Sequence, residues 1–321
     1  MMRVIFFGSP DYALPSLRGL IDAPDIDVVA VVSQPDRRRG RSAARTATPV
    51  KVLAEAAGIE VIQPQRIRRE QTEQLSTFDA DVGVVAASGH ILPRHLLESF
   101  PHQVLNVHAS LLPRHRGASP VAAAILAGDT ETGATIMQVV HEIDAGPVVA
   151  QVRTSIDPFD TTETVTDRVA DLGAQLLIET LPAWVAGDLT AEEQDGSLVT
   201  HAPRLARPDG VIDWSQPARA IWQRIRAFQP WPAATTHAGG QPLTVHEAWP
   251  LDGQFPEVPG SVIEGDGEPL SDLLPGRTAM AVIVCGEGAL ALLSVQRPGR
   301  RAVDIEQYLN GDHDLIGSRL G

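Results

Sequence analysis

The sequence predicts an α/β protein in which an open parallel sheet is followed by a smaller antiparallel β-barrel. Length is the first observation, because 321 residues exceed one ordinary domain and suffice for two. The second is that the first half alternates short apolar, β-branched runs with helical segments, as βαβ units do. The third is that the last third holds short apolar runs broken by glycine, proline and aspartate, which is typical of a small barrel.

The elements of the first half follow in order along the chain. Residues 4–7 form an apolar run, and residues 28–32 are apolar on both faces, as in a buried parallel strand. A helix over 49–57 ends at Gly58, because glycine readily adopts the left-handed conformation that closes a helix. The same alternation predicts further strands over 60–62, 82–86 and 104–108, and further helices over 14–21, 68–78 and 119–127.

Beyond residue 130 the pattern changes. Strands over 135–140 and 148–152 precede a long helix over 161–181, which we expect to begin with a capping box of Asp160 and Glu163. A polar stretch over 188–207 is expected to link a domain over 1–187 to a domain over 208–321. In the last domain we expect a helix over 218–227 and strands over 243–245, 261–263, 280–284 and 289–295.

Composition narrows the class of protein. The formal net charge of −14 argues against a protein that coats nucleic acid, although arginines crowd one segment, 37–45. No apolar stretch approaches the ~20 residues of a membrane span, and the first residues lack the features of a signal peptide. The single cysteine, Cys285, lies in an apolar run and is predicted to be a buried small hydrophobe. We therefore expect a monomeric protein of the reducing cytoplasm.

Two polar residues mark the end of the predicted strand over 104–108. Asn106 and His108 share one face of this strand, because side chains alternate, and they lie at the carboxyl edge, where open α/β sheets bind ligands. The apolar loop after them, 109–113, suits a flat, partly aromatic ligand. The alternative, that both side chains only satisfy backbone groups at a strand end, is the weaker interpretation of this combination.

Asp144 stands in a turn between two predicted strands. An aspartate before Ala-Gly is a common turn former. A carboxylate beside a histidine also fixes the tautomer of the imidazole and stabilises its charged form. Spacing alone leaves both interpretations open.

The segment 106–120 (NVHASLLPRHRGASP) strongly resembles the signature of methionyl-tRNA formyltransferases. Other segments that resemble this family run along the whole chain, at 7–11, 34–37, 48–51, 89–93, 128–137, 212–214 and 225–232. Motifs of the first domain are shared with other enzymes that use 10-formyltetrahydrofolate, whereas the matching segments of the second domain favour the tRNA enzyme.

The resemblance implies a Rossmann-like formyltransferase domain and an OB-like domain that helps to hold tRNA. It implies 10-formyltetrahydrofolate as the formyl donor, methionyl initiator tRNA as the acceptor, and no metal. The catalytic residues it implies are Asn106, His108 and Asp144. The residues implied to lie along the folate are Ser110, Leu111, Leu112, Pro113, Gly89 and Ile91. The residues implied to meet the tRNA are Arg37, Arg38, Arg39 and Arg41.

This chain departs from the family at three places. Ser88 stands where the family usually has tyrosine, and Ala145-Gly-Pro147 replaces the common Thr-Gly-Asp. Residues 208–321 hold 14 acidic residues against 8 arginines, a net charge of −6, where a basic face is expected. If this domain has a local basic patch, we expect it to be formed by Arg224, Arg226, Arg297, Arg300 and Arg301. Arg224 and Arg226 also fit ordinary exposed helix positions.

Four other functions fit parts of the sequence. A sugar-nucleotide N-formyltransferase would share the donor, but the arginine-rich segment and 225–232 favour tRNA. A formyltetrahydrofolate hydrolase needs no second domain of this kind. A dinucleotide-dependent oxidoreductase is disfavoured because the first turn, 8–12, lacks three glycines and contains a proline. A non-catalytic RNA-binding module would leave Asn106, His108 and Asp144 without a reason to occur together.

Overall fold

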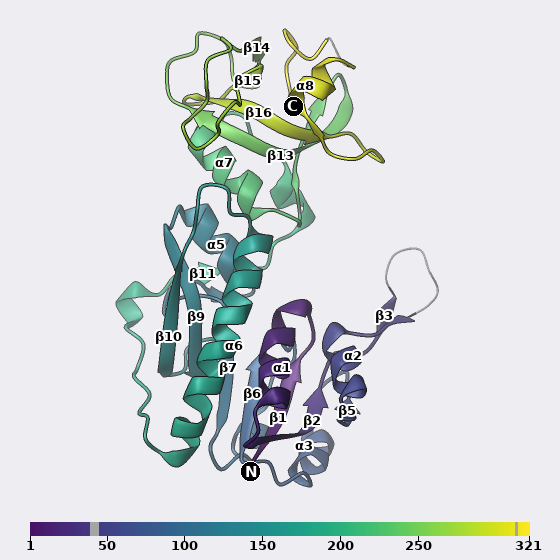
Figure 1. Ribbon diagram of the computed structural model, residues 1–321, viewed down its shortest axis with the longest axis vertical. Helices are drawn as coiled ribbons and strands as arrows, with labels where there is room; N and C mark the ends of the chain where they lie inside the picture. The colour runs from purple at the N-terminus through teal and green to yellow at the C-terminus, as the bar shows by residue number, and fades with distance from the viewer. Residues whose placement is uncertain (39–44, 312–313) are drawn as a thin grey trace. The chain divides into compact units, whose positions relative to one another are not determined.

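The computed structural model describes residues 1–38, 45–311 and 314–321, which form two compact units (Figure 1). The first unit comprises Met1–Val121, Thr130–Ser155 and Val165–Pro203, and the second Ala122–Asp129, Ile156–Thr164 and Arg204–Gly321. Residues 188–203, which fall in the expected linker, are thus part of the first unit. In the part of the chain that the structure describes, no helix is both long and apolar enough to cross a membrane.

The first unit is built on a seven-stranded sheet in the order β10-β9-β7-β6-β1-β2-β5. Its five parallel strands are β1 (Met2–Gly8), β2 (Ile26–Val32), β5 (Val61–Ile62), β6 (Val82–Ala86) and β7 (Val104–His108). The sheet ends in two antiparallel strands, β9 (Glu131–Gln138) and β10 (Val148–Ser155). The predicted fold class, a Rossmann-like α/β domain with a mostly parallel sheet, is confirmed.

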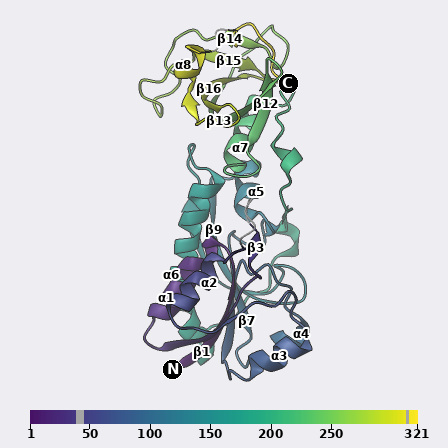
Figure 2. The ribbon, with the colours of Figure 1, turned by 90° about the vertical axis from the view of Figure 1, so that its right-hand side faces the viewer.

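Helices cover both faces of this sheet. The helices of the first unit are α1 (Leu14–Asp22), α2 (Pro49–Ala56), α3 (Arg69–Ser76), α4 (Arg94–Leu97) and most of α6 (Thr162–Ala186). A further helix, α5 (Pro120–Ala127), begins in the first unit, and the rest of it belongs to the second. Phe6 packs with residues of α1, α2 and α6, whereas its neighbour Phe7 packs with residues of α3 and α4 on the other face (Figure 2). Buried side chains on both faces explain why these strands are continuous apolar runs.

The start of α6 differs from the prediction. Thr161 and Thr164 cap the helix reciprocally, because the N–H of each residue donates to the hydroxyl of the other, at 3.0 and 3.4 Å. The Asp160 carboxylate instead accepts from the Asp157 N–H at 2.8 Å and from the Thr164 hydroxyl at 2.9 Å. The expected capping box of Asp160 and Glu163 was therefore wrong by one residue, since threonine also supplies the side-chain oxygen that a cap needs.

The second unit is an antiparallel sheet packed against helices. Its strands are β12 (Ala234–Ala238), β13 (Gln241–Leu251), β14 (Val262–Glu264), β15 (Ala281–Val284), β16 (Ala289–Gln296) and β17 (Val303–Asp304), and its helices are α7 (Ala218–Ala227) and α8 (Ile305–Leu309). The core includes Trp214, Trp222 and Leu290. Cys285 is buried there, and burial raises the pKa of its thiol to about 12, as expected of an unreactive cysteine.

Two short strand pairs complete the structure. One joins β3 (Arg37–Arg38) to β4 (Arg45–Thr46) in an antiparallel pair. The other joins β8 (Arg116–Gly117) to β11 (His201–Ala202) in parallel, and thereby ties the loop after β7 to the segment after α6.

Candidate active site

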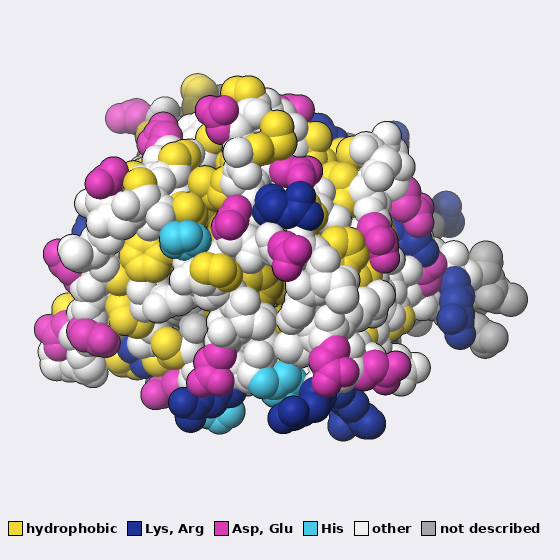
Figure 3. Space-filling view, turned by 90° about the horizontal axis from the view of Figure 1, so that it is seen from below, with side chains coloured by type: hydrophobic (Ala, Val, Ile, Leu, Met, Phe, Trp, Pro, Cys, Tyr) yellow, Lys and Arg dark blue, Asp and Glu magenta, His cyan; other side chains and the backbone are white. Residues whose placement is uncertain are grey.

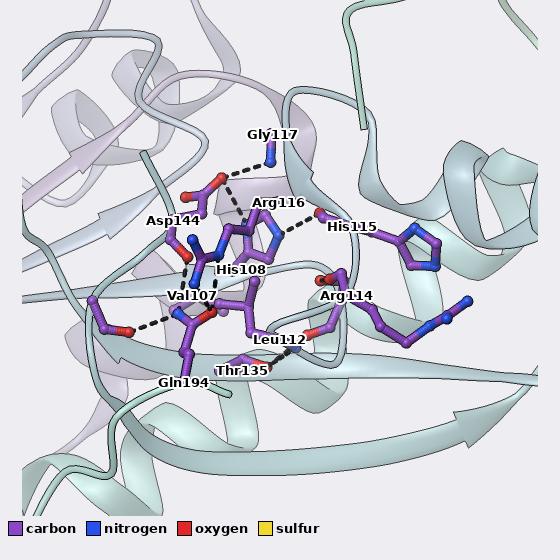
Figure 4. Close-up of polar contacts among 12 residues, drawn as sticks. Val107, His108, Leu112, Arg114, His115, Arg116, Gly117, Thr135, Asp144 and Gln194 are labelled. Atoms are coloured by element: carbon purple, nitrogen blue, oxygen red, sulfur yellow. Dashed lines mark hydrogen bonds and ion pairs between the residues drawn. The ribbon is translucent and has the colours of Figure 1, made fainter. Parts of the chain in front are cut away.

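His108 ends β7 at the carboxyl edge of the sheet, and both of its ring nitrogens face oxygen atoms (Figure 4). Nε2 lies 3.1 Å from the carbonyl oxygen of His115, and Nδ1 lies 3.6 Å from Oδ2 of Asp144. The His108 side chain is only 6% exposed. Because a carbonyl and a carboxylate only accept hydrogen bonds, each neutral tautomer satisfies one contact, whereas the doubly protonated ring satisfies both. The two contacts thus hold the ring in one orientation.

Asp144 lies in the loop between β9 and β10, and it is held in an uncommon conformation. Its φ is 52°, in the left-handed region that aspartate tolerates better than most residues. Its Oδ2 accepts a hydrogen bond from the Gly117 N–H at 2.9 Å and faces His108. The juxtaposition of Asp144 and His108, which spacing left open, is thus present in the structure.

Asn106 lies two residues before His108 on the same strand. Its backbone stands between Val85 of β6 and Met137 of β9, and its side chain is half-buried. Alternation along the strand gives it the same face as His108. Its amide offers two N–H donors at this edge, beside the histidine.

The loop after β7 is fixed by hydrogen bonds of its own. The buried Ser110 hydroxyl donates to the Arg114 carbonyl at 2.7 Å, and the Thr135 hydroxyl donates to the Ser110 carbonyl at 2.6 Å. The buried Leu112 is held through its N–H, which lies 3.2 Å from the Thr135 hydroxyl. Leu111 and Pro113 are half-buried and so leave apolar surface for a ligand.

Gly89 and Ile91 lie in the loop that follows β6. Gly89 has a φ of 71°, which favours glycine, and Ile91 is 86% exposed. Ser88 is buried, and its hydroxyl lies 3.2 Å from Nδ1 of His90. The Ser88 side chain therefore forms a contact within its own loop, while the apolar Ile91 side chain is open to solvent.

The arginine-rich segment is described only in part. Arg37 in β3 is exposed, and its Nη2 donates to Gln34 Oε1 at 3.1 Å. Arg38 is described through its backbone pairing with Arg45, whereas Arg39 and Arg41 lie outside the described residues.

A polar cluster holds the base of this segment. Nζ of Lys51 donates to Asp36 Oδ2 at 2.9 Å and to Gln63 Oε1 at 2.8 Å, and the Gln63 amide donates to Asp36 Oδ1 at 2.7 Å. Hydrogen bonds from Gln63 and then from Lys51 lower the pKa of the Asp36 carboxyl.

Two residues of the site, Arg116 and Gln194, were missed by sequence reasoning. Arg116 donates through Nε and Nη2 to Oε1 of Gln194, at 3.0 and 2.8 Å. The Gln194 amide nitrogen donates to the carbonyls of Asp144 and Gly146, at 2.9 and 2.7 Å (Figure 4). The only sequence signal for this contact was the position of Arg116 inside the 106–120 motif, because Gln194 stands in a polar stretch without periodicity.

Arginines of the second unit mostly stabilise its own loops. Arg226 is buried, its guanidinium lies 4.0 Å from the Trp222 ring centroid, and its Nη1 donates to the Asp157 carbonyl at 2.9 Å. Burial lowers the pKa of Arg226 to about 10. Arg224 donates to the Asp209 carbonyl at 2.7 Å. The expectation that Arg226 is an exposed helix position or part of a surface patch was therefore wrong, because its side chain packs on an aromatic ring.

Charge on the surface is mixed in sign. On the face in Figure 3, acidic side chains are interspersed with hydrophobic and uncharged ones, and basic side chains gather at its lower edge. Recognition of an anionic partner by this chain is thus expected to depend on local arginines rather than on a broad positive field.

Comparison with known proteins identifies close relatives of the whole chain. The family model for formyl transferase matches residues 2–181, and that for the formyl transferase C-terminal domain matches residues 204–313. The chain is 42% identical over 321 residues to the methionyl-tRNA formyltransferase of Methylococcus capsulatus, with all of both chains covered. It is 39% identical to that of Streptococcus pneumoniae, again with all of both chains covered.

Solved structures with the same fold are more distant in sequence. An N-formyltransferase from Helicobacter canadensis, in complex with folinic acid and dTDP-3-aminofucose, matches with a TM-score of 0.64 at 17% identity, covering 91% of this chain and 99% of that one. HypX from Aquifex aeolicus, in complex with tetrahydrofolic acid, matches with a TM-score of 0.58 at 17% identity. This chain is covered to 98% in that match and spans about half (48%) of the HypX chain.

Proposed function

Because the chain belongs to the methionyl-tRNA formyltransferase family, we propose that it transfers the formyl group of 10-formyltetrahydrofolate to the amino group of methionyl initiator tRNA. The observation that carries this proposal is the full-length match to curated relatives, 42% identical over 321 residues. This match runs through both domains of the chain. The activity supports translation initiation in the cytoplasm, and we propose that the enzyme works as a monomer.

The reaction forms one C–N bond and breaks another. The amino nitrogen of the acceptor attacks the formyl carbon, and the formyl oxygen becomes negative in a tetrahedral intermediate. The Asn106 amide is a suitable donor to this oxygen, and His108 becomes one when its Nε2–H leaves the His115 carbonyl for the substrate; one such donor is worth about 2.7–4 kcal/mol of the barrier. When the C–N bond to the folate collapses, formylmethionyl-tRNA and tetrahydrofolate are released.

Proton transfer is the role that the His108–Asp144 pair supports. The attacking amine loses a proton and the departing folate nitrogen gains one. An α-amino group has a pKa near ~7.7–8.0, so a mild base suffices to deprotonate it. The Asp144 carboxylate, 3.6 Å from Nδ1 of His108, orients the imidazole ring that carries this proton in transit.

For the folate we propose a site between two loops of the first domain. One is the loop after β7, with Ser110, Leu111, Leu112 and Pro113, and the other is the loop after β6, with Gly89 and Ile91. The proposal is supported by apolar surface at Leu111, Pro113 and Ile91, beside a rigid backbone. Such surface suits the flat ring system of a folate.

For the tRNA we propose contacts from the arginine-rich segment and from the second domain. Arg37, Arg38, Arg39 and Arg41 would bind phosphate groups of the acceptor end, as arginine commonly does. We assign catalysis to residues 1–187, a connecting role to 188–207 and tRNA contact to 208–321.

Formylation of methionine-charged initiator tRNA by the purified protein and 10-formyltetrahydrofolate tests the proposal. We expect rapid formylation by the wild type, and a loss of at least about 100-fold in Asn106→Ala and in His108→Ala. A wild-type protein that leaves the aminoacyl-tRNA unformylated would contradict the proposed function.

A further inference from the structure

We infer that residues 192–202, the bracing segment, position the catalytic carboxylate, and that Gln194 is the residue through which they act. The inference rests on the proposed function, because it concerns the Asp144 side chain of that site. The bracing segment follows α6 and falls within the stretch that the sequence marks as a linker. Its contacts assign it a second role, as part of the active site.

The bracing segment touches both loops that surround His108. Glu192 pairs with Val148, just after the Asp144 loop, through two backbone hydrogen bonds of 2.8 Å each. At its other end, the Thr200 carbonyl accepts from the Arg116 N–H at 2.9 Å, and the Thr200 hydroxyl accepts from the His115 N–H at 2.8 Å. The bracing segment therefore holds the loop with Asp144 and the loop with His115 at a fixed separation.

Gln194 lies between these two anchors, and its whole amide is engaged. The nitrogen donates to the carbonyls of Asp144 and Gly146, and the oxygen accepts two hydrogen bonds from the Arg116 guanidinium. A flipped amide would set its N–H groups against the guanidinium donors and its oxygen against two carbonyl oxygens. Only one orientation satisfies all partners, so Gln194 fixes the Asp144 backbone relative to Arg116.

The Asp144 loop needs such support. A non-glycine residue at a φ of 52° is disfavoured, and it persists where its surroundings determine it. The neighbouring Ile143 side chain is 73% exposed, so little packing holds the loop from that side. When Gln194 is lost, the Asp144 carbonyl loses this donor, and the Gly117 N–H is left to hold the carboxylate beside His108 on a less firmly fixed backbone.

A double-mutant cycle tests whether Gln194 acts through Asp144. Single-turnover formylation is measured with the full-length enzyme in excess over methionine-charged initiator tRNA, for the wild type, Gln194→Ala, Asp144→Asn and the double variant. We expect Gln194→Ala to slow the chemical step roughly 10- to 100-fold, with the KM for folate unchanged, because a small displacement of a catalytic group is costly. In the Asp144→Asn background the same change should cost less than about twofold.

A matched control distinguishes the loss of Asp144 positioning from the general effect of removing a side-chain hydrogen bond. The Gln71 amide oxygen accepts a hydrogen bond from the Arg68 N–H at 3.0 Å, so Gln71→Ala also removes a side-chain brace, at the start of α3 in the first unit. Its rate should stay within about twofold of the wild type. If Gln194→Ala does not fold, Gln194→Glu replaces it with the same expectation, because it keeps the oxygen facing Arg116 but loses both donated bonds.

The outcomes distinguish this inference from the proposed function. Equal losses from Gln194→Ala in both backgrounds, or no loss in either, would overturn the positioning role while Asp144→Asn remains slow. A full rate in Asp144→Asn would overturn the role of the carboxylate and with it the positioning role, whereas no formylation by the wild type would overturn the proposed function.

Discussion

At the scale of single residues, the surroundings of His108 carry the chemical argument. The ring lies between the His115 carbonyl, at 3.1 Å from Nε2, and the Asp144 carboxylate, at 3.6 Å from Nδ1. Both contacts orient the ring, and it is buried, so water competes little with either contact. The pair is therefore suited to hold a proton briefly during transfer from the amine to the folate.

Asp144→Asn tests this pair directly. Asparagine keeps an oxygen that can accept from the Gly117 N–H, but it removes the negative charge that favours the protonated imidazole. We expect kcat to fall by about 100-fold or more, with little change in the KM for either substrate. Steady-state kinetics measure both constants, and a kcat within about threefold of the wild type would contradict the role given to the carboxylate.

Asp36 gives a prediction on pH. Its pKa is lowered from 3.8 in the folded protein, first by Gln63 and then by Lys51, so the unfolded chain binds a proton more readily than the folded one. The stabilisation is therefore complete above the ordinary pKa and is lost as the pH falls through the lowered value. Thermal melts between about pH 6 and pH 3 should show a shallower decline for Asp36→Asn than for the wild type. Parallel curves would contradict this linkage.

At the scale of elements, the sequence predicted best the strands and helices that a local pattern of residues specifies. The strands over 82–86 and 104–108 and the helix over 218–227 have the predicted bounds, because β-branched runs and an amphipathic repeat specify them. β12 was not predicted, since Ala234, Thr236 and Ala238 give only a weak apolar pattern for its buried face. The contact of Gln194 with Asp144 spans 50 residues and leaves no periodic trace, so only the folded chain reveals it.

Gly117 tests how tightly the bracing segment fits against the loop. Its φ is 123°, and a Cβ there would lie 2.5 Å from the Ala202 carbonyl oxygen. We expect Gly117→Ala to lower the free energy of unfolding by about 1–3 kcal/mol and to slow formylation, because the Gly117 N–H must leave Asp144. Urea unfolding and single-turnover rates measure the two effects.

Gly58→Ala is the matched control for this change. Gly58 also has a positive φ, 73°, but nothing lies within 4 Å of a Cβ at that position. It should cost about 1–2 kcal/mol of stability and leave the rate unchanged. Equal effects of the two substitutions on the rate would contradict the tight fit between Gly117 and the bracing segment.

At the scale of the whole molecule, the net charge of −14 opposes unspecific binding of an anionic tRNA. Several arginines of the second unit are occupied with its own structure, Arg226 on Trp222 and Arg224 on the Asp209 carbonyl. We therefore expect affinity for tRNA to depend on a few exposed arginines of the first domain.

Arg37→Glu tests this dependence on local charge. We expect the KM for tRNA to rise about tenfold, because a phosphate contact becomes a repulsion, while the KM for folate stays unchanged. Arg18→Glu, at an exposed position of α1, makes the same change of charge elsewhere and should leave both constants unchanged. Equal effects of the two variants would show that net charge, rather than the arginine-rich segment, governs the affinity.

A competition between two acceptors tests most directly which amine receives the formyl group. Purified protein and 10-formyltetrahydrofolate are offered methionine-charged initiator tRNA and an amino-sugar nucleotide in one reaction, and the kcat/KM for each is measured. We expect formylation of the tRNA alone. Formylation of the sugar alone would keep the fold, the donor and the His108–Asp144 pair, and would contradict the assignment to translation initiation.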